Sequence, residues 1–372
     1  MARIYQLAFR DTTGSLVTVM DLTGAVQMRY SKTLNGCGAF LLTLPADLSK
    51  PIMSTLDAVV QVIWSDEAGQ NVIDGTYLLR RFAPVGEGLN DVFMVGGVGL
   101  EHLLWRRIFL SEDDPLEVNG FSTKSGPADT VMSQVIDEQC ITPATNTSRA
   151  LPGLQLGPVA GTGSSVAFRE ESSDTKVLEL VRKLAAASGA DFWVEYGQTG
   201  PTFTVQLGTV GTDRRKSTNS PLGLPYVYFA PQLGNLDQPE LDMDRQEEQN
   251  HVYVFGQGPA GSRLVYGQVG SGAADSPWND CEFGVQAKNT KTLDDWLTEA
   301  DAALNDERTR LTSFTFRPQK DTRFALYGRD WFLGDKVTVA YQDHEFEMRI
   351  PTVEITVTSE GDDIKPTMEL LA

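Results

Sequence analysis

Val60-Gln-Val-Ile-Trp64 and Val337-Thr-Val-Ala-Tyr341 are the two stretches that decide the fold of this chain. In both, a large apolar residue stands at every second position, and this period of two predicts a β-strand with one buried face. A turn, a long strand, a second turn and a last strand follow each stretch. Residues 57–97 and residues 335–372 therefore share one plan, although few of their residues are identical.

The agreement between the two segments extends to the positions of the turns and the lengths of the strands. Two interpretations stay open: an internal duplication of one β-module, or the ordinary resemblance of one all-β meander to another. A duplication would mean two copies of the module with helical segments inserted between and into them. The corresponding pieces are the turns Asp66-Glu67 and Asp343-His344, the long strands 77–82 and 353–358, the turns 86–88 and 361–363, and the last strands 92–95 and 367–370.

The residues before the first stretch also have a β-type pattern. Apolar residues alternate with polar ones in Val26–Tyr30 and again in Phe40–Leu44, and Pro45 ends the second run. Between them, Asn35-Gly-Cys-Gly38 supplies the residue types that adopt the positive φ angles of a tight turn. The first hundred residues are therefore predicted to be an all-β barrel or sandwich. The predicted cores of the two modules include Val26, Met28, Phe40, Leu42, Val60, Val62, Val337 and Val339.

The middle of the chain changes in character, because its apolar residues follow a helical period. Residues 129–140 and 174–188 are predicted to be amphipathic helices. Ser173 or Asp174 can cap the start of the second helix, and Gly189 suits the left-handed position after its end.

Connections and one further helix complete the pattern. Residues 143–165 are rich in Gly, Thr, Ser and Pro and are predicted to form a long loop. Residues 192–196 and 202–207 are expected to pair as a hairpin. A helical insert is predicted for residues 291–310, opening with a Thr292-x-x-Asp295 cap.

Length and composition limit the class of protein. The chain has 372 residues, of which 41% are hydrophobic, enough for two to four domains. The longest apolar runs have the length of a strand, so neither a membrane-spanning segment nor a secretory leader is predicted. The formal net charge of −19 argues against specific nucleic-acid binding through a basic face. Scattered reduced cysteines (Cys37, Cys140, Cys281) and structural histidines (His102, His251, His344) are expected.

No catalytic, cofactor-binding or metal-binding residue is predicted, because each candidate motif lacks its required context. Gly256–Gly261 matches G-x-G-x-x-G, but a dinucleotide site needs a helix immediately afterwards. Pro259 interrupts this motif and residues 262–266 read as a strand, so a hairpin loop is expected. Gly157–Ser164 resembles a phosphate-binding loop but lacks the lysine that such a loop requires.

Acidic pairs and single tryptophans leave two other function classes open. A cell-wall-degrading enzyme needs only two carboxylates, but all the acidic pairs are predicted to lie in turns, caps or solvated helix faces. A carbohydrate-binding module would use exposed aromatic side chains, which are more often packing residues. The acidic pairs are Asp113-Asp114, Asp242 with Asp244, Asp294-Asp295 and Asp362-Asp363, and the tryptophans are Trp278, Trp296 and Trp331.

Four strand-and-turn stretches, in this order and spacing, resemble the siphophage tail-tip (baseplate) hub family, the proteins related to the N-terminal hub part of tail-associated Tal-type proteins. The first stretch continues with Leu42 and Leu44-Pro45. The four are Leu34-Asn-Gly-Cys-Gly-Ala-Phe40, Ile73-Asp-Gly-Thr-Tyr77, Gln249-Asn-His-Val-Tyr-Val-Phe-Gly-Gln-Gly258 and Leu333-Gly-Asp-Lys-Val-Thr-Val339.

The resemblance implies a fold that is mainly β with α+β inserts: two tail-tube-like antiparallel β-barrels plus two smaller inserted domains. It implies neither an enzyme nor a cofactor. On this division, residues 1–105 form the first barrel, 106–235 an α+β insert, 236–258 with 308–372 the second barrel, and 259–307 a smaller insert with one helix.

The same resemblance implies a structural virion protein at the distal end of the phage tail, assembled in the host cytoplasm. Three chains with two barrels each would form a homotrimeric ring that joins the sixfold tail tube to a threefold tip. The ring would surround the channel for DNA and the tape-measure protein. A distal tail protein ring or the tail tube would lie above it, and a tip or fibre/receptor-binding protein below.

Relatives often continue past the hub into a peptidase, lysozyme-like or fibre region, whereas this sequence stops at Ala372. An enzymatic tip is therefore expected to be a separate protein. The alternatives to a hub are a cell-wall-degrading tail enzyme or a carbohydrate-binding tail module.

The charge gives a further expectation for such a ring, since three copies carry three times the formal net charge of −19. A wall lined by Lys and Arg would bind DNA phosphates, whereas an acidic or neutral wall would let the duplex slide. More Asp and Glu than Lys and Arg are therefore expected to face the axis. The alternative is that the acids lie on the outer surface and serve solubility.

Overall fold

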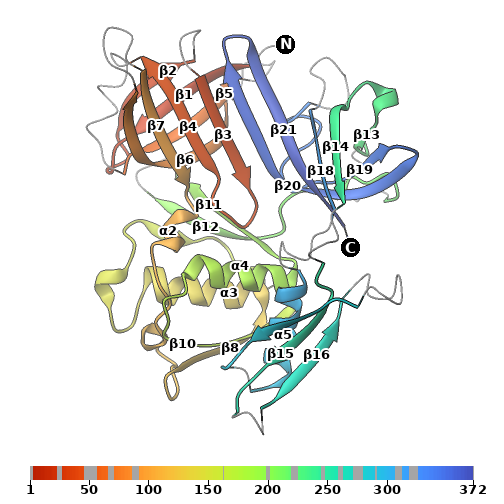
Figure 1. The fold of residues 1–372 in the computed structure, drawn as a ribbon. Helices are drawn as coiled ribbons and strands as arrows, with labels where there is room; N and C mark the ends of the chain where they lie inside the picture. The colour runs from red at the N-terminus through yellow and green to blue at the C-terminus, as the bar shows by residue number, and fades with distance from the viewer. Residues whose placement is uncertain are drawn as a thin grey trace.

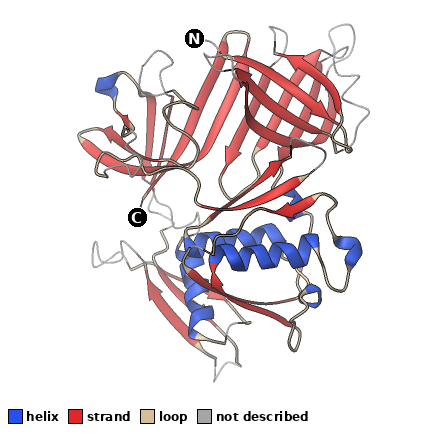
Figure 2. Ribbon diagram, turned by 180° about the vertical axis from the view of Figure 1, so that it is seen from behind, coloured by secondary structure: helices blue, strands red, loops and turns tan. Residues whose placement is uncertain are grey.

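The computed structural model places a broad β layer above a smaller region of helices and short sheets (Figure 1). Seen from behind, the α-helices lie together beneath the β layer (Figure 2). The structure describes residues 3–22, 27–45, 57–65, 71–85, 92–161, 163–197, 202–218, 225–243, 248–258, 263–270, 280–289, 291–305, 312–317 and 326–371.

The first half of the β layer follows the predicted alternation of apolar residues. In β4, for example, Phe40, Leu42 and Leu44 are buried while the residues between them are not. Its strands are β1 (Ile4–Arg10), β2 (Leu16–Asp21), β3 (Gln27–Thr33), β4 (Ala39–Pro45), β5 (Val59–Ser65), β6 (Asn71–Val85) and β7 (Val92–Gly99).

The second half repeats the meander of the first. The middle strands of the two meanders, β6 and β20, both have 15 residues, which confirms that the two segments share a strand plan. The predicted turns 66–67 and 86–88 lie outside the described residues. The strands of this half are β13 (Tyr228–Phe229), β14 (Asp237–Met243), β18 (Thr312–Arg317), β19 (Lys336–Tyr341), β20 (His344–Thr358) and β21 (Gly361–Leu370).

The two halves are not separate barrels, which corrects the prediction of two antiparallel barrels. One 13-stranded sheet runs through both halves in the order β14-β18-β21-β20-β3-β4-β7-β6-β5-β1-β2, and no pairing among the described strands closes either half on itself. The cause is the length of β20: its first part pairs with β19 and its last part, Thr352–Val357, pairs with β3. The sheet is also not wholly antiparallel, because β13 pairs in parallel with β19.

One continuous core lies behind this sheet. Seven of the eight predicted core residues belong to it, each at most 3% exposed, and Val26 lies outside the described residues. The expectation of one core per barrel is therefore wrong, because the shared strand pairing lets apolar side chains of both halves pack together. The seven are Met28, Phe40, Leu42, Val60, Val62, Val337 and Val339.

The region below the first half combines helices with two small sheets. The predicted helix 129–140 is α3 (Ala128–Ile136) followed by a π-helical turn, and the predicted helix 174–188 is α4 (Val177–Ser188). Lys176 precedes α4 in place of the expected Ser173 or Asp174, because the Glu179 side chain accepts the Lys176 N–H and closes the first turn. Gly189 ends α4 with φ 70°, as expected. The remaining elements are α2 (His102–Trp105), β8 (Phe121–Pro127), β9 (Leu154–Leu156), β10 (Ser165–Glu171), β11 (Asp191–Tyr196) and β12 (Phe203–Gly208).

A third unit consists of β15 (His251–Phe255), β16 (Val265–Val269), β17 (Glu282–Gln286) and α5 (Leu293–Leu304). The predicted cap at its helix is confirmed, since the Thr292 side chain accepts the Asp295 N–H and the Asp295 carboxylate accepts the Thr292 N–H. Lys183 on α4 bonds both Glu170 and Glu299, which joins α4, β10 and α5. The division of the chain into domains stays a prediction, in which β15 falls within residues 236–258 and β13 within residues 106–235.

Candidate functional site

Where the structure describes them, the glycine-rich motifs lack the helix N-terminus that a phosphate-binding site requires. Gly256 and Gly258 follow β15, and β15 pairs in antiparallel fashion with β16, so the described part of the motif opens a hairpin, as predicted. Residues 259–261 lie outside the described residues. Gly157–Ser164 lies between β9 and β10 and leads into a strand, so no helix N-terminus follows it.

One of the acidic pairs is not where the sequence placed it. Asp113 and Asp114 were expected in a solvated turn, but both are buried. Asp113 bonds Arg149, and Asp114 accepts hydrogen bonds from Ser122 at 2.6 Å and Lys124 at 2.8 Å. Each carboxylate is therefore held by a cation, as a buried charge must be, and serves the packing of this region. A pattern of neighbouring acids gives no sign of partners that lie ten or more positions away.

The other acidic pairs have ordinary structural roles. Asp295 caps α5, Asp242 is exposed on β14, and Asp244 lies outside the described residues. Asp362 accepts the Tyr5 hydroxyl at 3.0 Å and pairs with Arg3 at 3.4 Å. None of these contacts unites two carboxylates across a cleft in the way that glycoside hydrolysis requires.

The candidate sugar-binding tryptophans are packing residues where the structure describes them. Trp331 is 0% exposed in the main core. Trp296 on α5 stacks on Tyr266 of β16. Trp278 lies outside the described residues. All three cysteines are free thiols, and burial raises the pKa of Cys37 and of Cys140 to about 12, as expected for unreactive thiols.

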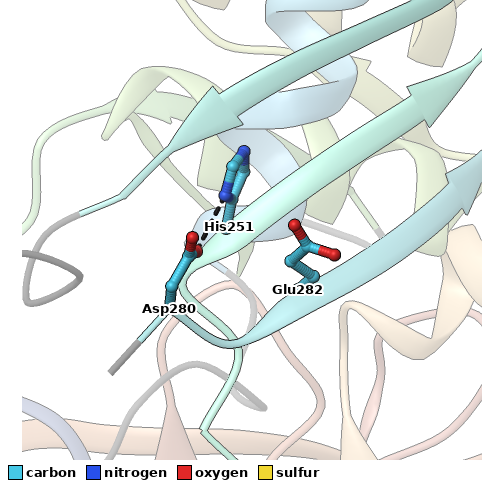
Figure 3. Close-up of side chains that lie close together, drawn as sticks. All are labelled: His251, Asp280 and Glu282. Carbon is cyan, nitrogen blue, oxygen red and sulfur yellow. Dashed lines mark hydrogen bonds and ion pairs between the residues drawn. The ribbon is translucent and has the colours of Figure 1, made fainter. Parts of the chain in front are cut away.

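A histidine and two carboxylates come together on the third unit (Figure 3). His251 begins β15, Glu282 stands beside it on the parallel strand β17, and Asp280 precedes β17. The His251 Nδ1 lies 2.8 Å from an Asp280 carboxylate oxygen, and the Tyr253 hydroxyl donates to Glu282 at 3.2 Å. Ligand atoms of the three residues lie within 4.8 Å of one another, which suits a divalent cation. Both carboxylates are exposed, however, and exposed acidic groups are common in proteins without a bound ion.

The strongest polar cluster lies in the joint between the two halves of the β layer. Asp74 is the extra residue of a β-bulge, since Val62 pairs with Gly75 and Ile63 with Ile73. The bulge allows the Asp74 carboxylate to accept the Tyr30 hydroxyl at 2.6 Å, the Lys32 ammonium at 2.9 Å and the Tyr327 hydroxyl at 3.0 Å. Side chains from both halves of the chain thus meet at one buried carboxylate.

The titration of this cluster follows from its contacts. Burial raises the pKa of Asp74, but the Lys32 ammonium and the hydrogen bonds outweigh burial, so the pKa is lowered overall. Burial lowers the pKa of Lys32, but its interactions with Tyr327 and Asp74 raise it overall. At neutral pH the pair is therefore ionised inside the joint. An ionised pair whose charges are matched in this way fits a structural cluster.

The outer face of the joint carries an ion pair between the halves. Ile355 of β20 stands opposite Tyr30 of β3, and Glu354 stands opposite Ser31. Arg29 lies two positions before Ser31, on the same face of β3, and its guanidinium reaches the Glu354 carboxylate at 2.7 Å. Two strands that are more than 300 residues apart are thus joined by a hydrogen-bonded ladder with a charge pair on its surface.

Among the described residues, β2, β13, β14 and the second part of β6 each have a strand edge without a partner. β14 is the last strand at one end of the sheet. β6 pairs with β5 only as far as Leu78, so residues 80–85 pair on one side alone, with β7. Unpaired edges are where sheets recruit further strands.

A cavity of about 430 Å³ lies where α4 and α5 meet the β layer. Two of the three described cations that line it are held in ion pairs: Lys183 bonds Glu170 and Glu299, and Arg349 bonds Asp191. Asp191 is fully buried and also accepts the Asn35 side-chain N–H at 3.0 Å, so it ties the helical region to both halves of the sheet. The cavity is therefore lined by a structural joint.

Among the described residues, no helix combines the length and the apolar character needed to cross a bilayer. No curated protein is similar enough in sequence to match the chain.

Solved phage tail proteins share this fold over nearly the whole chain. A 43 kDa tail protein of prophage MuSo2 from Shewanella oneidensis aligns with a TM-score of 0.59 at 10% identity, covering 98% of both chains. A tail protein from Neisseria meningitidis MC58 aligns with a TM-score of 0.58 at 12% identity, covering 98% of this chain and 96% of the other. Prophage tail protein gp18 from Listeria monocytogenes EGD-e gives 0.52 at 10% identity, covering 98% and 94%.

Structural matches at such low sequence identity show the fold alone, whereas a family model shows which family the chain belongs to. The model of the Siphovirus ReqiPepy6 Gp37-like protein matches residues 4–368. The resemblance to siphophage tail hubs drawn from four sequence stretches is thereby confirmed, and family and fold are those of a phage tail protein. The chain belongs to the Siphovirus ReqiPepy6 Gp37-like protein family.

Proposed function

We propose that the chain is a non-enzymatic structural protein of the tail tip: a hub that forms a homotrimeric ring between the sixfold tail tube and a threefold tip. The observation that carries the proposal is the repeated strand order. The first half runs β3-β4-β7-β6-β5 and the second runs β14-β18-β21-β20-β19, side by side in one sheet. A chain with two equivalent units supplies six units in a trimer, which matches a sixfold tube.

The outer face of this sheet suits a channel wall. On β3, β20 and β21, the residues that alternate with core residues are polar or small, as in Thr352, Glu354, Thr356 and Thr358 of β20. We propose that this face surrounds the channel for DNA and the tape-measure protein. The remaining partners belong to the same proposal: a distal tail protein ring or the tail tube above, and a tip or fibre/receptor-binding protein below.

The charge of that face is mixed and slightly acidic among the described residues. In the same registers, acids outnumber bases, which agrees with the expectation of a wall that does not hold DNA phosphates. Away from the part of the sheet that α4 and α5 cover, the acids are Glu240, Asp242, Glu354 and Asp363, and the bases are Arg29, Arg81 and Lys365.

Imaging tests the ring. Cryo-electron microscopy of the tail tip should show three copies of this chain around an open axis, with the 13-stranded sheet facing that axis. A monomer or dimer peripheral to the axis would refute the hub. A net-positive lining of the channel would refute the sliding-wall proposal and leave the hub intact.

A further inference from the structure

We propose that the second part of β6 pairs with β14 of a neighbouring copy of this chain, so that the sheet continues from one chain to the next. This proposal rests on the ring proposed above and names the surface that closes it. The partner is therefore a second copy of the same chain, and the interface is an antiparallel strand pair.

The internal repeat shows which strands correspond. The orders β3-β4-β7-β6-β5 and β14-β18-β21-β20-β19 place β14 where β3 stands, and β20 where β6 stands. Within the chain, β20 of the second half pairs with β3 of the first. Applying the same step again places β6 of one copy beside β14 of the next. Repetition of one joint is how a chain with two equivalent units builds a ring.

The core residues show which positions of β6 and β20 are equivalent in the two halves. Tyr77, Leu79 and Phe82 on β6 have the same spacing as Met348, Ile350 and Val353 on β20, with two residues between the last members of each set. In both strands the pairing with the next strand is irregular in this interval. Phe82 therefore corresponds to Val353, and Pro84 to Ile355.

The pairing of β3 and β14 with their neighbouring strands shows which of their positions are equivalent. Tyr30 stands opposite Phe40 on β4, and Leu241 stands opposite Phe314 on β18. Phe40 in turn stands opposite Gly97, and Phe314 opposite Met368. Tyr30 therefore corresponds to Leu241, and Ser31 to Asp242.

The joint within the chain can now be transferred to the neighbour. Because Ile355 stands opposite Tyr30, Pro84 is placed opposite Leu241 of the next copy. Because Glu354 stands opposite Ser31, Ala83 is placed opposite Asp242 of the next copy.

Neither edge has a paired strand among the described residues. The last described backbone contact on the outer side of β6 is made by the Leu79 N–H, which donates to the Ala58 carbonyl at 2.8 Å, and β14 ends the sheet. The half with β6 and β7 and the half with β14 occupy opposite sides of the β layer (Figure 1). Two complementary edges on opposite sides give a head-to-tail interface, which closes as a ring when the rotation allows.

The charges on the two edges are complementary. β14 carries exposed Glu240 and Asp242, and the second part of β6 carries exposed Arg80 and Arg81. Arg80 already pairs with Asp57, but Arg81 lies on the same face as Ala83 and so stands diagonal to Asp242 of the neighbour. Diagonal side chains on adjacent strands are within reach of a long cation. The joint within the chain has the same kind of pair, Arg29 with Glu354, with the signs of the two strands exchanged.

Disulfide trapping tests the register directly. Ala83→Cys with Asp242→Cys should give covalent trimers under oxidation, and mass spectrometry of unreduced peptides should show residue 83 joined to residue 242 of another chain. Directly opposite residues of an antiparallel pair have Cα atoms about 4.5–5.5 Å apart, which lies within the Cα separation that a disulfide can bridge. The matched control is Val19→Cys with Asp242→Cys, which would be joined only if β14 paired with β2, the other end of the sheet.

The outcomes separate this proposal from the ring itself. Trimers joined through 19 and 242, or trimers without either disulfide, overturn the edge pairing and leave the ring standing. Monomers at every concentration, without cross-links, overturn both.

Charge exchange gives a second test that needs no cysteine. Arg81→Asp and Asp242→Arg should each weaken the trimer, raising its dissociation constant several-fold in native mass spectrometry. The double variant should recover most of that loss, because the pair is restored with its signs exchanged. Equal weakening in the single and double variants contradicts the proposed contact.

Discussion

The two meanders β5–β7 and β19–β21 share a strand plan but differ in what lies beside their middle strands. The last part of β20 is covered by β3, which fuses the two halves into one sheet. The corresponding part of β6 is an open edge among the described residues. The first part of β6 also contains a bulge at Asp74, whereas β20 pairs with β19 without one. A repeated module can therefore make either a joint inside the chain or a surface for another chain, and its neighbours decide which.

The largest effect is expected at the bulge that distinguishes β6. Asp74→Ala leaves the buried Lys32 ammonium and two tyrosine hydroxyls without their acceptor, and removing one member of a buried ion pair costs about 3–5 kcal/mol. Urea denaturation should show this loss in the free energy of unfolding. Asp21→Ala, which removes an exposed carboxylate of β2, is the matched control and should cost less than about 1 kcal/mol.

The same carboxylate gives a pH dependence. Since the pKa of Asp74 is lowered in the folded protein, its stabilising effect is present above the unfolded-state pKa and is lost as pH falls through the folded-state pKa. The difference in unfolding free energy between wild type and Asp74→Asn should therefore shrink toward acid pH. A difference that grows as pH falls would contradict the ionised state assigned to the cluster.

The next effect tests whether the two halves are one cooperative unit. Leu42→Ala in the first half and Ile355→Ala in the second each open a cavity in the shared core, at a cost of about 2–5 kcal/mol. Because both side chains belong to one core, both variants should lower the same calorimetric transition of the β layer. Two transitions, each sensitive to only one of the substitutions, would show that the halves unfold as separate barrels after all.

Local pattern predicted much of this fold, because strand alternation, turn residues and helix caps are written in neighbouring positions. Both meanders, the hairpin after Phe255 and the Thr292 cap were predicted for that reason. The joint between β3 and β20 was not, because period-two alternation tells which face of a strand is buried but not which distant strand lies beside it. The expectation of two closed barrels failed at that point.

Site residues were harder to predict than strands. Partners of a buried charge come from distant positions, as with Asp113 and Arg149, so neighbouring acids gave the wrong expectation of a solvated turn. The contact of His251 with Asp280 depends on the parallel pairing of β15 and β17, which no spacing in the sequence signals. Only the family resemblance, carried by turns such as Asn35–Gly38, pointed to function.

A smaller effect on the free energy of unfolding is expected at Glu101, just after the last strand of the first meander. Glu101 follows β7, and its side chain accepts the Val194 N–H at 3.1 Å. Burial raises the pKa of Glu101 to about 7 from 4.5. The charged form is thus disfavoured in the folded protein, so the stability associated with the neutral form is full below the unfolded-state pKa and falls as pH rises toward 7.

Glu101→Gln should therefore stabilise the protein more at pH 8.5 than at pH 6, by on the order of 1 kcal/mol. Thermal unfolding at the two pH values measures this difference. Glu195→Gln, at an exposed position of β11, is the matched control for the substitution itself. Equal shifts at both pH values would mean that the glutamine acts through shape and not through charge.

The smallest effect is expected at the surface of the joint inside the chain. The Arg29–Glu354 pair lies on the outer face, with 59% and 36% of the two side chains exposed, so water and salt screen it. Glu354→Gln should cost between about 0 and 1 kcal/mol of unfolding free energy, and less in 1 M salt. If the joint depended on this pair, β3 and β20 would separate in the variant, and the amide protons of β3 would exchange faster with solvent. We expect their exchange to stay slow, because the ladder and the core behind it hold these strands together. The same reasoning sets the role of Arg81 and Asp242 in the proposed contact between chains: the charges select the partner edge, and the paired strands supply the strength.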